Sequence, residues 1–150
     1  RRLAAAVCVI TAQSDGVRGG LTATAVMSLS ADPPRLAVAV NKTASAYPLI
    51  AKARSFAVNV LRYEQLAIAS RFAGACKGEA RFAHAQWAAL QTGAPALVDA
   101  AATFDCTLHQ AIDAGTHVLL IGDVRALASS SAQRPLLYAT DNGHRWANGP

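Results

Sequence analysis

The chain has 150 residues, enough for one domain with a substantial core and too few for two domains of ordinary size. Hydrophobic residues make up 53% and charged residues 15%, so intrinsic disorder is excluded and extensive burial is expected. The net charge is +5 and the pI about 9.6, but the cations are scattered without a dense run, which ranks nucleic acid low as a partner and suits an anionic small molecule instead.

The first half of the chain predicts strands and two helices separated by turn residues. Ser14–Gly20 supplies the first turn, and Asp32-Pro33-Pro34 ends a strand because proline cannot donate to a ladder. Two segments have helical spacing of apolar residues. In chain order we expect strands over Ala4–Thr11, Leu21–Ser30 and Arg35–Val40, a helix over Ala44–Arg54, a strand over Ser55–Leu61 and a helix over Tyr63–Ala73.

The second half predicts an irregular stretch followed by a long hairpin. Gly74–Gly93 shows no clear period. Ala96–Ala111 and Thr116–Leu127 have the composition of two long strands around a turn at residues 113–115. A last short strand is expected over Pro135–Tyr138.

About six strands with few helices and no regular strand–helix alternation favour a mainly β fold, a six-stranded antiparallel barrel that is closed or half-closed. The glycines at 16–20 do not match the dinucleotide-binding fingerprint, and a strand rather than a helix follows them. No repeat or linker divides the chain, so residues 1–150 are expected to form a single domain.

A row of hydroxyl groups is the first unusual feature. In the alternating segment Leu21–Ser30, one face carries Thr22, Thr24, Val26, Ser28 and Ser30. A strand with one solvated face explains this pattern, and composition alone favours that interpretation. The same row of hydroxyls, opposite an apolar face, would also line a pocket for a polar heteroaromatic ring.

The segment 41–45 follows a strand and opens a helix. Thr43 or Ser45 is expected to cap this helix by accepting a hydrogen bond from an early backbone N–H. A phosphate site is the functional alternative, because a helix start with hydroxyls and Lys42 nearby attracts anions.

Side-chain acid–base chemistry has few candidates. His117 follows the hairpin turn at the mouth of the expected barrel, where a solvated histidine and a ligand contact are both open. The other histidines share no metal-ligand spacing with it, so no metal site is expected. An enzyme with this composition would depend on the chemistry of a cofactor.

Three cysteines without a C-x-x-C pair predict neither a disulfide framework nor zinc. Cys8 and Cys106 lie in apolar runs and are expected to be core thiols in the reducing cytoplasm. The longest apolar stretches are too short for a membrane span, and no signal peptide is evident. The Ala-rich, weakly charged surface predicts a homodimer.

Taken together in this order, these motifs resemble the flavin reductase family with the FMN-binding split β-barrel fold, the reductase components of two-component flavin-dependent monooxygenases. The resemblance runs from about Ala6 to Tyr138. It is carried by Gly20–Val26 with Ser28 and Ser30, Asp32-Pro33-Pro34, Asn41 with Ser45, Phe56–Leu61, Gln65, Arg71-Phe72-Ala73, Arg81-Phe82, Gly93–Leu97, Cys106, Gly115-Thr116-His117 with Gly122-Asp123-Val124, and Pro135–Tyr138.

The resemblance implies an NAD(P)H:flavin oxidoreductase that transfers a hydride from NADH or NADPH to FMN, with FAD possible, and supplies reduced flavin to a partner monooxygenase by diffusion. It places His117 on the nicotinamide side, although the family's Gly-Asp-His triplet reads Gly115-Thr116-His117 here. It also implies homodimers with flavin near the subunit interface. The cofactor-binding residues that it implies are Thr22, Ala23, Thr24, Ala25, Val26, Ser28, Asn41, Ser45, Phe72, Arg81 and Phe82.

Other functions stay open on the sequence. The reduced flavin could serve another acceptor, such as a corrin cobalt, an iron chelate or a nitroaromatic compound. A non-catalytic flavin-binding protein would retain flavin without oxidising NADH. A related barrel that binds haem is disfavoured by the few histidines and their settings.

Overall fold

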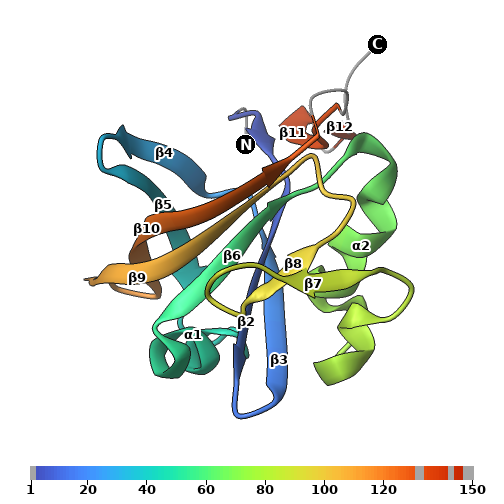
Figure 1. Cartoon of the computed structure of the whole chain (residues 1–150). Coiled ribbons are helices and arrows are strands. Elements are labelled where there is room, and N and C mark those ends of the chain that lie inside the picture. The colour runs from blue at the N-terminus through green and yellow to red at the C-terminus, as the bar shows by residue number, and fades with distance from the viewer. Residues whose placement is uncertain (1–2, 131–133, 142–143, 147–150) are drawn as a thin grey trace.

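A computed structural model describes residues 3–130, 134–141 and 144–146 of the chain. Its main element is a seven-stranded antiparallel sheet with the strand order β3-β2-β6-β9-β10-β5-β4 (Figure 1). There are two smaller sheets, β1-β11-β12 and β7-β8, and strand β8 packs against the inner strands β2 and β6 of the large one. The strands are β1 (Ala5–Ala6), β2 (Cys8–Ser14), β3 (Val17–Ala23), β4 (Val26–Ala31), β5 (Pro34–Asn41), β6 (Ser55–Val60), β7 (Trp87–Ala89), β8 (Pro95–Leu97), β9 (Ala102–Ala114), β10 (His117–Ser129), β11 (Leu137–Asp141) and β12 (His144–Trp146).

The helices are short and lie outside the sheet. Helix α1 (Tyr47–Ala53) follows β5, and a continuous helical stretch follows β6. That stretch consists of the 3₁₀ turn η1 (Tyr63–Gln65), helix α2 (Leu66–Ser70) and the π-helical turn η2 (Arg71–Ala75), with the 3₁₀ turn η3 (Gly78–Phe82) after it. No helix in the described part of the chain is long and apolar enough to cross a membrane.

The two edges of the large sheet are joined by Thr24 and Ala25 alone, which connect β3 to β4. A flat sheet of seven strands would hold its edges about 29 Å apart, because neighbouring strands are about 4.8 Å apart. Two linking residues span at most about 11 Å, so the sheet must curl sharply. Within the described residues β3 and β4 do not pair with each other, and the linker is tied instead by the Ala39 N–H, which donates to the Ala25 carbonyl at 3.0 Å.

The core fills the concave side of this curl. Its larger cluster includes Ile10, Val38, Phe56 and Leu120, all 0% exposed. Close packing leaves no room for a side chain at Gly122, where an added Cβ would lie 2.6 Å from the Phe56 ring.

The prediction that two of the cysteines are core thiols is confirmed. Cys8 and Cys106 are free and buried, and burial raises the pKa of each thiol to about 12. At neutral pH both therefore behave as small apolar side chains. Cys76, at the end of η2, is free and half-buried.

The mainly β antiparallel fold is confirmed, but the strand count of six is wrong. The irregular stretch 74–93 contains η3 and β7, and Pro95–Leu97 forms the separate strand β8. These two strands are short because they pair only with each other, over three residues. The predicted long hairpin is confirmed, with β9 and β10 turning at Gly115 and Thr116.

Two predicted boundaries are wrong in a way that affects function. The first turn contains only Asp15 and Gly16, so Val17–Gly20 extends β3. The segment Leu21–Ser30 is two strands, β3 and β4, at opposite edges of the sheet, with a register shift between Ser28 and Ser30. Strict alternation in the sequence does not reveal a break between two strands that continue the same period.

Candidate functional site

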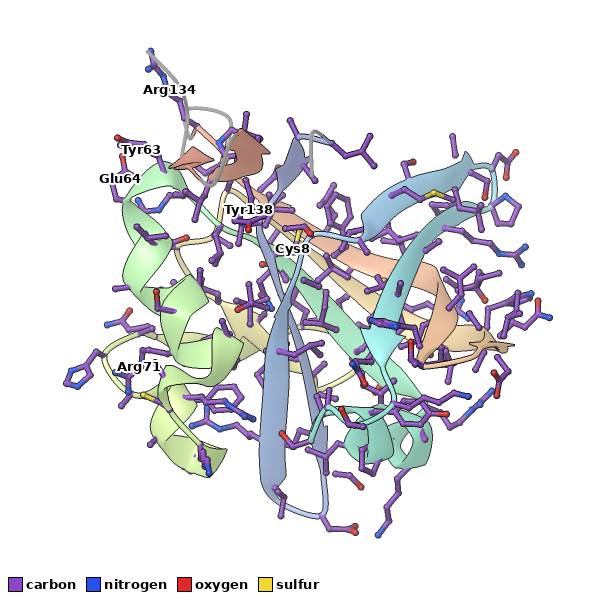
Figure 2. All side chains as sticks on the ribbon, turned by 180° about the vertical axis from the view of Figure 1, so that it is seen from behind. Cys8, Tyr63, Glu64, Arg71, Arg134 and Tyr138 are labelled. Atoms are coloured by element: carbon purple, nitrogen blue, oxygen red, sulfur yellow. The ribbon has the colours of Figure 1, made fainter. Side chains whose placement is uncertain are left out.

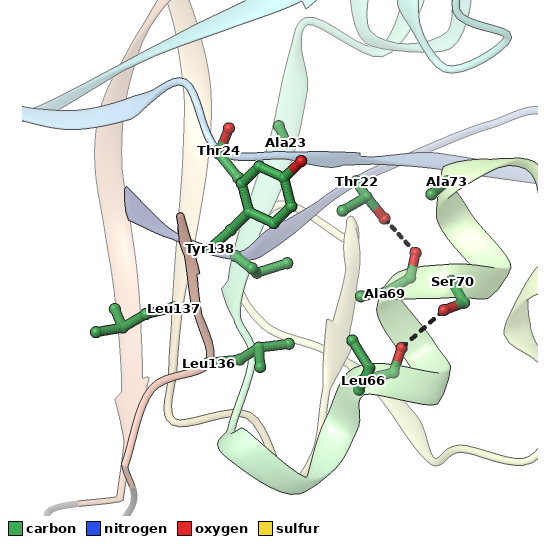
Figure 3. A pocket seen from close by; sticks show the side chains of 11 residues that line it. Thr22, Ala23, Thr24, Leu66, Ala69, Ser70, Ala73, Leu136, Leu137 and Tyr138 are labelled. Atoms are coloured by element: carbon green, nitrogen blue, oxygen red, sulfur yellow. Dashed lines mark hydrogen bonds between the residues drawn. The ribbon is translucent and has the colours of Figure 1, made fainter. Parts of the chain in front are cut away.

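A pocket of about 470 Å³ opens where β3 ends, between α2 and β11 (Figure 3). Its lining is mostly apolar, with a few hydroxyl groups. Pockets of about 300–1,000 Å³ with this character commonly hold small organic ligands. The lining residues are Val7, Thr22, Ala23, Thr24, Leu66, Ala69, Ser70, Ala73, Leu136, Leu137 and Tyr138.

Two of the hydroxyl groups at the pocket are engaged in holding its walls together. Thr22 donates from Oγ1 to the Ala69 carbonyl at 2.7 Å, which ties the end of β3 to α2. Ser70 donates to the Leu66 carbonyl at 3.2 Å within the helix. The hydroxyls of Thr24 and Tyr138 make no hydrogen bond within the described part of the chain, so they remain available to a ligand.

Two adjacent glycines let β3 lie close to its neighbours below the pocket. A Cβ at Gly20 would lie 2.7 Å from the Phe72 ring and 2.8 Å from the Ile10 carbonyl oxygen. A Cβ at Gly19 would lie 2.5 Å from Leu49 of α1. The strand therefore runs between α1 on one face and η2 on the other, which any larger residue would push apart.

A polar cluster lies beside the N-terminal half of β3. It consists of Asn41, Thr43, Ser45 and Arg81. The Asn41 side-chain oxygen accepts from the Thr43 backbone N–H at 2.9 Å and from its hydroxyl at 2.8 Å. Arg81 donates from Nη1 to the Ser45 hydroxyl at 2.8 Å. The structure thus brings together Ser45 and Arg81, which lie 36 residues apart in sequence.

The predicted helix cap is wrong. Helix α1 begins at Tyr47, its N-cap is Ala46, and no side chain caps it. The Thr43 hydroxyl is occupied by Asn41 and the Ser45 hydroxyl by Arg81, so neither reaches the first turn. With seven residues and a start beyond Ser45, α1 does not provide the phosphate site by its N-terminus.

An aromatic cluster supports the segment that carries Arg81. Phe72 and Phe82 meet edge to face with ring centroids 5.1 Å apart, and Trp87 packs against both. The Arg18 guanidinium lies 4.3 Å above the Phe82 ring and pairs with Glu79. The hydrogen bond from Arg18 lowers the pKa of Glu79. Since Phe72 and Phe82 are each 3% exposed, they form the floor beneath this region and not an open wall.

The remaining candidates lie farther from the pocket. His117 opens β10 opposite Asn41, is exposed, and has its Nδ1 2.9 Å from the Thr116 hydroxyl. Ser28 and Ser30 belong to β4, where Ser30 donates to the Pro33 carbonyl at 2.5 Å. The prediction of one continuous hydroxyl face is therefore wrong. Of the residues predicted to form it, only Thr22 and Thr24 line the pocket.

Eight of the eleven residues that line the pocket were not among the predicted site residues. Leu66, Ala69, Ser70 and Ala73 come from α2 and η2. Leu137 and Tyr138 open β11, Leu136 directly precedes that strand, and Val7 lies between β1 and β2. Small apolar residues on a short helix look like core positions in a sequence. The available signals were the helical spacing of Leu66, Ala69 and Ala73 and the family motif over Pro135–Tyr138.

Comparison with known proteins gives consistent matches along the chain. The family model described as "Flavin reductase like domain" matches residues 1–147. An FMN reductase (NADH) RutF of Variovorax paradoxus is 40% identical over 149 residues, covering 99% of this chain and 83% of that protein.

Solved structures agree. A putative flavin reductase from Haemophilus somnus superposes with a TM-score of 0.90 at 36% identity, covering 97% of this chain and 93% of that one. An NADH:FAD oxidoreductase of Streptomyces globisporus, in complex with NAD and FAD fragments, gives 0.88 at 26% identity, with 99% and 88% covered. BorF, the flavin reductase component of a bacterial two-component tryptophan halogenase, gives 0.85 at 29% identity, with 98% and 93% covered.

Proposed function

The chain belongs to the flavin reductase like domain family, and we propose on this basis that it is an NAD(P)H-dependent flavin reductase whose flavin ring occupies the pocket at the end of β3. The observation that carries the proposal is the match of a named NADH-dependent FMN reductase to nearly the whole chain, together with a pocket of suitable size at the residues that the sequence had indicated. FMN is the expected flavin, FAD is an alternative, and NADH or NADPH is the co-substrate.

The residues present fit such a cofactor. An isoalloxazine is a flat ring system with polar atoms along one edge, and the pocket offers an apolar lining with the free hydroxyls of Thr24 and Tyr138. A flavin phosphate needs cationic and hydroxyl donors, and Arg81 with Ser45 provides both. Strand β3 connects the two places. Its C-terminal end lines the pocket, and Gly19, nearer to its start, lies against α1, the helix that follows Ser45 in the chain.

A flavin held there would supply the redox chemistry of hydride transfer with the nicotinamide. The protein's own contribution is to position the flavin ring and to offer hydrogen-bond donors to its polar atoms. Thr22, Ala23 and Thr24 would present backbone and hydroxyl groups along the ring, with Ala25, Val26 and Ser28 continuing along the linker and β4. Donors placed there stabilise negative charge that arrives on a reduced ring. A nicotinamide would need access to one face of the flavin ring, and the protein would have to leave that face uncovered.

At the other end, Asn41 would hold the loop that presents Ser45, while Arg81 and Ser45 would bind the phosphate. Phe72 and Phe82 would support this arrangement from below through the aromatic cluster. His117, opposite Asn41 on the neighbouring strand, would contact the nicotinamide side of the complex.

The assembly that we propose is a homodimer formed through the convex face of the sheet. On that face Met27, Ala37 and Ile121 lie in one row across three strands, and Ala39, Leu119 and Ile112 lie in the next. Met27 and Ile112 are 55% and 39% exposed, and a contiguous apolar surface that reaches the solvent is typical of a subunit interface. Each subunit would then be a single domain, and its curled sheet would form one split barrel.

We also propose that reduced flavin leaves for a partner oxygenase by diffusion, supported by the similarity to a reductase component of a two-component halogenase. An open pocket permits this exchange. A cytoplasmic location, expected from the unpaired cysteines, stays a prediction.

The direct test is to add NADH to the purified protein with FMN under anaerobic conditions and to record flavin absorbance. Bleaching many times faster than in a mixture without protein is the expected result. A rate equal to that of free flavin would overturn the enzymatic proposal, even if the protein bound FMN.

A further inference from the structure

Arg81 extends from a segment with little regular structure of its own. The 3₁₀ turn η3 is five residues long and begins at Gly78, whose φ of +54° lies in the left-handed region. At its end the Ala83 N–H donates to the Ala80 carbonyl at 3.4 Å, a long hydrogen bond. A turn this short is not stable alone, so the position of the Arg81 guanidinium depends on what holds η3 from outside.

Arg71, on the preceding turn η2, provides this support. Its Nε donates to the Arg81 carbonyl at 3.3 Å and its Nη2 donates to the Ala80 carbonyl. A planar guanidinium can bind two successive carbonyls at once, which a lysine ammonium cannot do with the same fixed geometry. The side chain of Arg71 is thereby committed to backbone groups of η3.

The support is reciprocal. Arg81 donates from Nε to the Cys76 carbonyl at 3.1 Å, and the Cys76 N–H donates to the Arg71 carbonyl at 3.3 Å. Each arginine thus holds the backbone next to the other, and the segment 71–81 closes on itself. After these bonds, Arg81 still has the Nη1 that faces Ser45 and an Nη2 for which no partner lies within the described residues.

We propose that Arg71 is a positioning residue for the flavin phosphate: it fixes η3 so that Arg81 and Ser45 present their donors together. This inference rests on the proposed function. An arginine on a free loop loses side-chain rotamer entropy when a ligand fixes it, and a partner that orders it beforehand removes part of that cost. Arg71 acts through Arg81 and does not itself reach Ser45.

The experiment compares FMN with riboflavin, which has the same ring and lacks the phosphate. Dissociation constants are measured by titration of flavin fluorescence for the wild type, Arg71→Gln, Arg81→Gln and the double variant. We expect FMN binding to weaken about 30-fold in Arg81→Gln and about fivefold in Arg71→Gln, with riboflavin binding changed by less than about twofold in both. The double variant should match Arg81→Gln, because Arg71 has nothing left to position.

Turnover at saturating FMN gives a second readout, expected to be unchanged in Arg71→Gln while the KM for FMN rises. Arg71→Lys keeps the positive charge but cannot donate to two successive carbonyls in the same fixed geometry. Its affinities for the two flavins should therefore resemble those of Arg71→Gln. Lys52→Gln is the control, since Lys52 is an exposed cation on α1 that pairs with Asp15 in the turn between β2 and β3. Its affinity for both flavins should equal that of the wild type.

Equal weakening of FMN and riboflavin in Arg71→Gln would overturn the inference, and so would additive losses in the double variant or full rescue by Arg71→Lys. If Arg71→Gln fails to fold, Arg71→Lys carries the same test. Failure of the proposed function looks different: the wild type would then bind neither flavin. A wild type that binds both flavins equally well would retain the function and refute the phosphate site.

Discussion

The two ends of β3 offer a ligand different things. At its C-terminal end, Thr22–Thr24 border a hollow of about 470 Å³ in which the Thr24 hydroxyl is free. Beside its N-terminal half, Ser45 and Arg81 already bond to each other, and Figure 2 shows β3 running between α1 and the helical segment that carries Arg71. A ring can enter the first region without breaking any bond. A phosphate at the second must replace a protein bond with its own.

This difference predicts a division of labour. Burial of the ring contributes most of the binding free energy, because apolar area removed from water is worth about 25 cal/mol per Å². Exchange of one polar partner for another contributes less net energy but discriminates among flavins. The changes below separate the two ends, from the largest expected effect to the smallest.

The largest effect should come from Gly20, which lies between the two ends. In Gly20→Ala the new methyl group would lie within 2.8 Å of both the Phe72 ring and the Ile10 carbonyl oxygen, and the carbonyl is backbone that cannot move aside. Overpacking of this kind should lower the free energy of unfolding by about 2–3 kcal/mol, measured by urea denaturation. Ala111→Val, at an exposed strand position, should change it by less than about 0.5 kcal/mol. Equal effects would show that β3 is not held as described.

A tryptophan in place of Ala73 should fill the hollow. Ala73 is exposed and lines the pocket, so stability should change little. FMN and riboflavin should both bind at least about 20-fold more weakly, a loss near 1.8 kcal/mol, because they share the excluded ring. Fluorescence titration measures both. Selective loss of FMN alone would place the ring elsewhere.

Removal of the Ser45 hydroxyl should affect only the phosphate. Ser45→Ala deletes one hydrogen-bond partner of Arg81 and is expected to weaken FMN binding by about fivefold, the value of one ordinary hydrogen bond, near 1 kcal/mol. Riboflavin should bind as it does to the wild type. Ser30→Ala, which removes a hydroxyl on β4 that donates to the Pro33 carbonyl, is the control and should leave the FMN-to-riboflavin ratio unchanged.

A substitution of His117 tests the proposed contact with the nicotinamide co-substrate. Its exposed ring opposite Asn41 leads us to expect that His117→Ala raises the KM for NADH by about threefold while the dissociation constant of FMN stays the same. Steady-state kinetics and titration give the two values. Equal losses in both would contradict a role on the nicotinamide side.

The smallest effect concerns Asp113, which ties the hairpin tip to Lys42 beside Asn41. The hydrogen bond from Lys42, and then that from the Gly115 N–H, lower the pKa of Asp113. A lowered pKa in the folded state means that this pair stabilises the protein above the unfolded-state value, about 4, and that the contribution disappears as the pH falls through the folded value. Asp113→Asn should therefore lose stability less steeply in acid while differing little at neutral pH, because exposed pairs contribute little. Urea midpoints between about pH 2 and 7 that decline in parallel would exclude this contribution.

The sequence by itself determined the class of fold, the hairpin of β9 and β10, the two buried thiols and the segment Thr22–Thr24 as a candidate ligand contact. These follow from local properties: β-branched runs, turn residues, apolar neighbours and the order of motifs along the chain. What it did not determine was where the hydroxyl row breaks, because the alternation of side chains continues unchanged across residues 24 and 25 while the chain passes from one edge of the sheet to the other.

Only the tertiary structure decided that Ala69, Ala73 and Leu136 share a pocket with Thr22, and that Arg81 meets Ser45 while Arg71 holds Arg81 in place. Such contacts join residues that are 10 to more than 100 positions apart, from β3 to β11 or from η2 to η3. A local pattern records which face of an element is apolar. It does not record which other element that face will meet, because that is settled by the curl of the whole sheet and by how closely its glycines allow the neighbouring helices to pack.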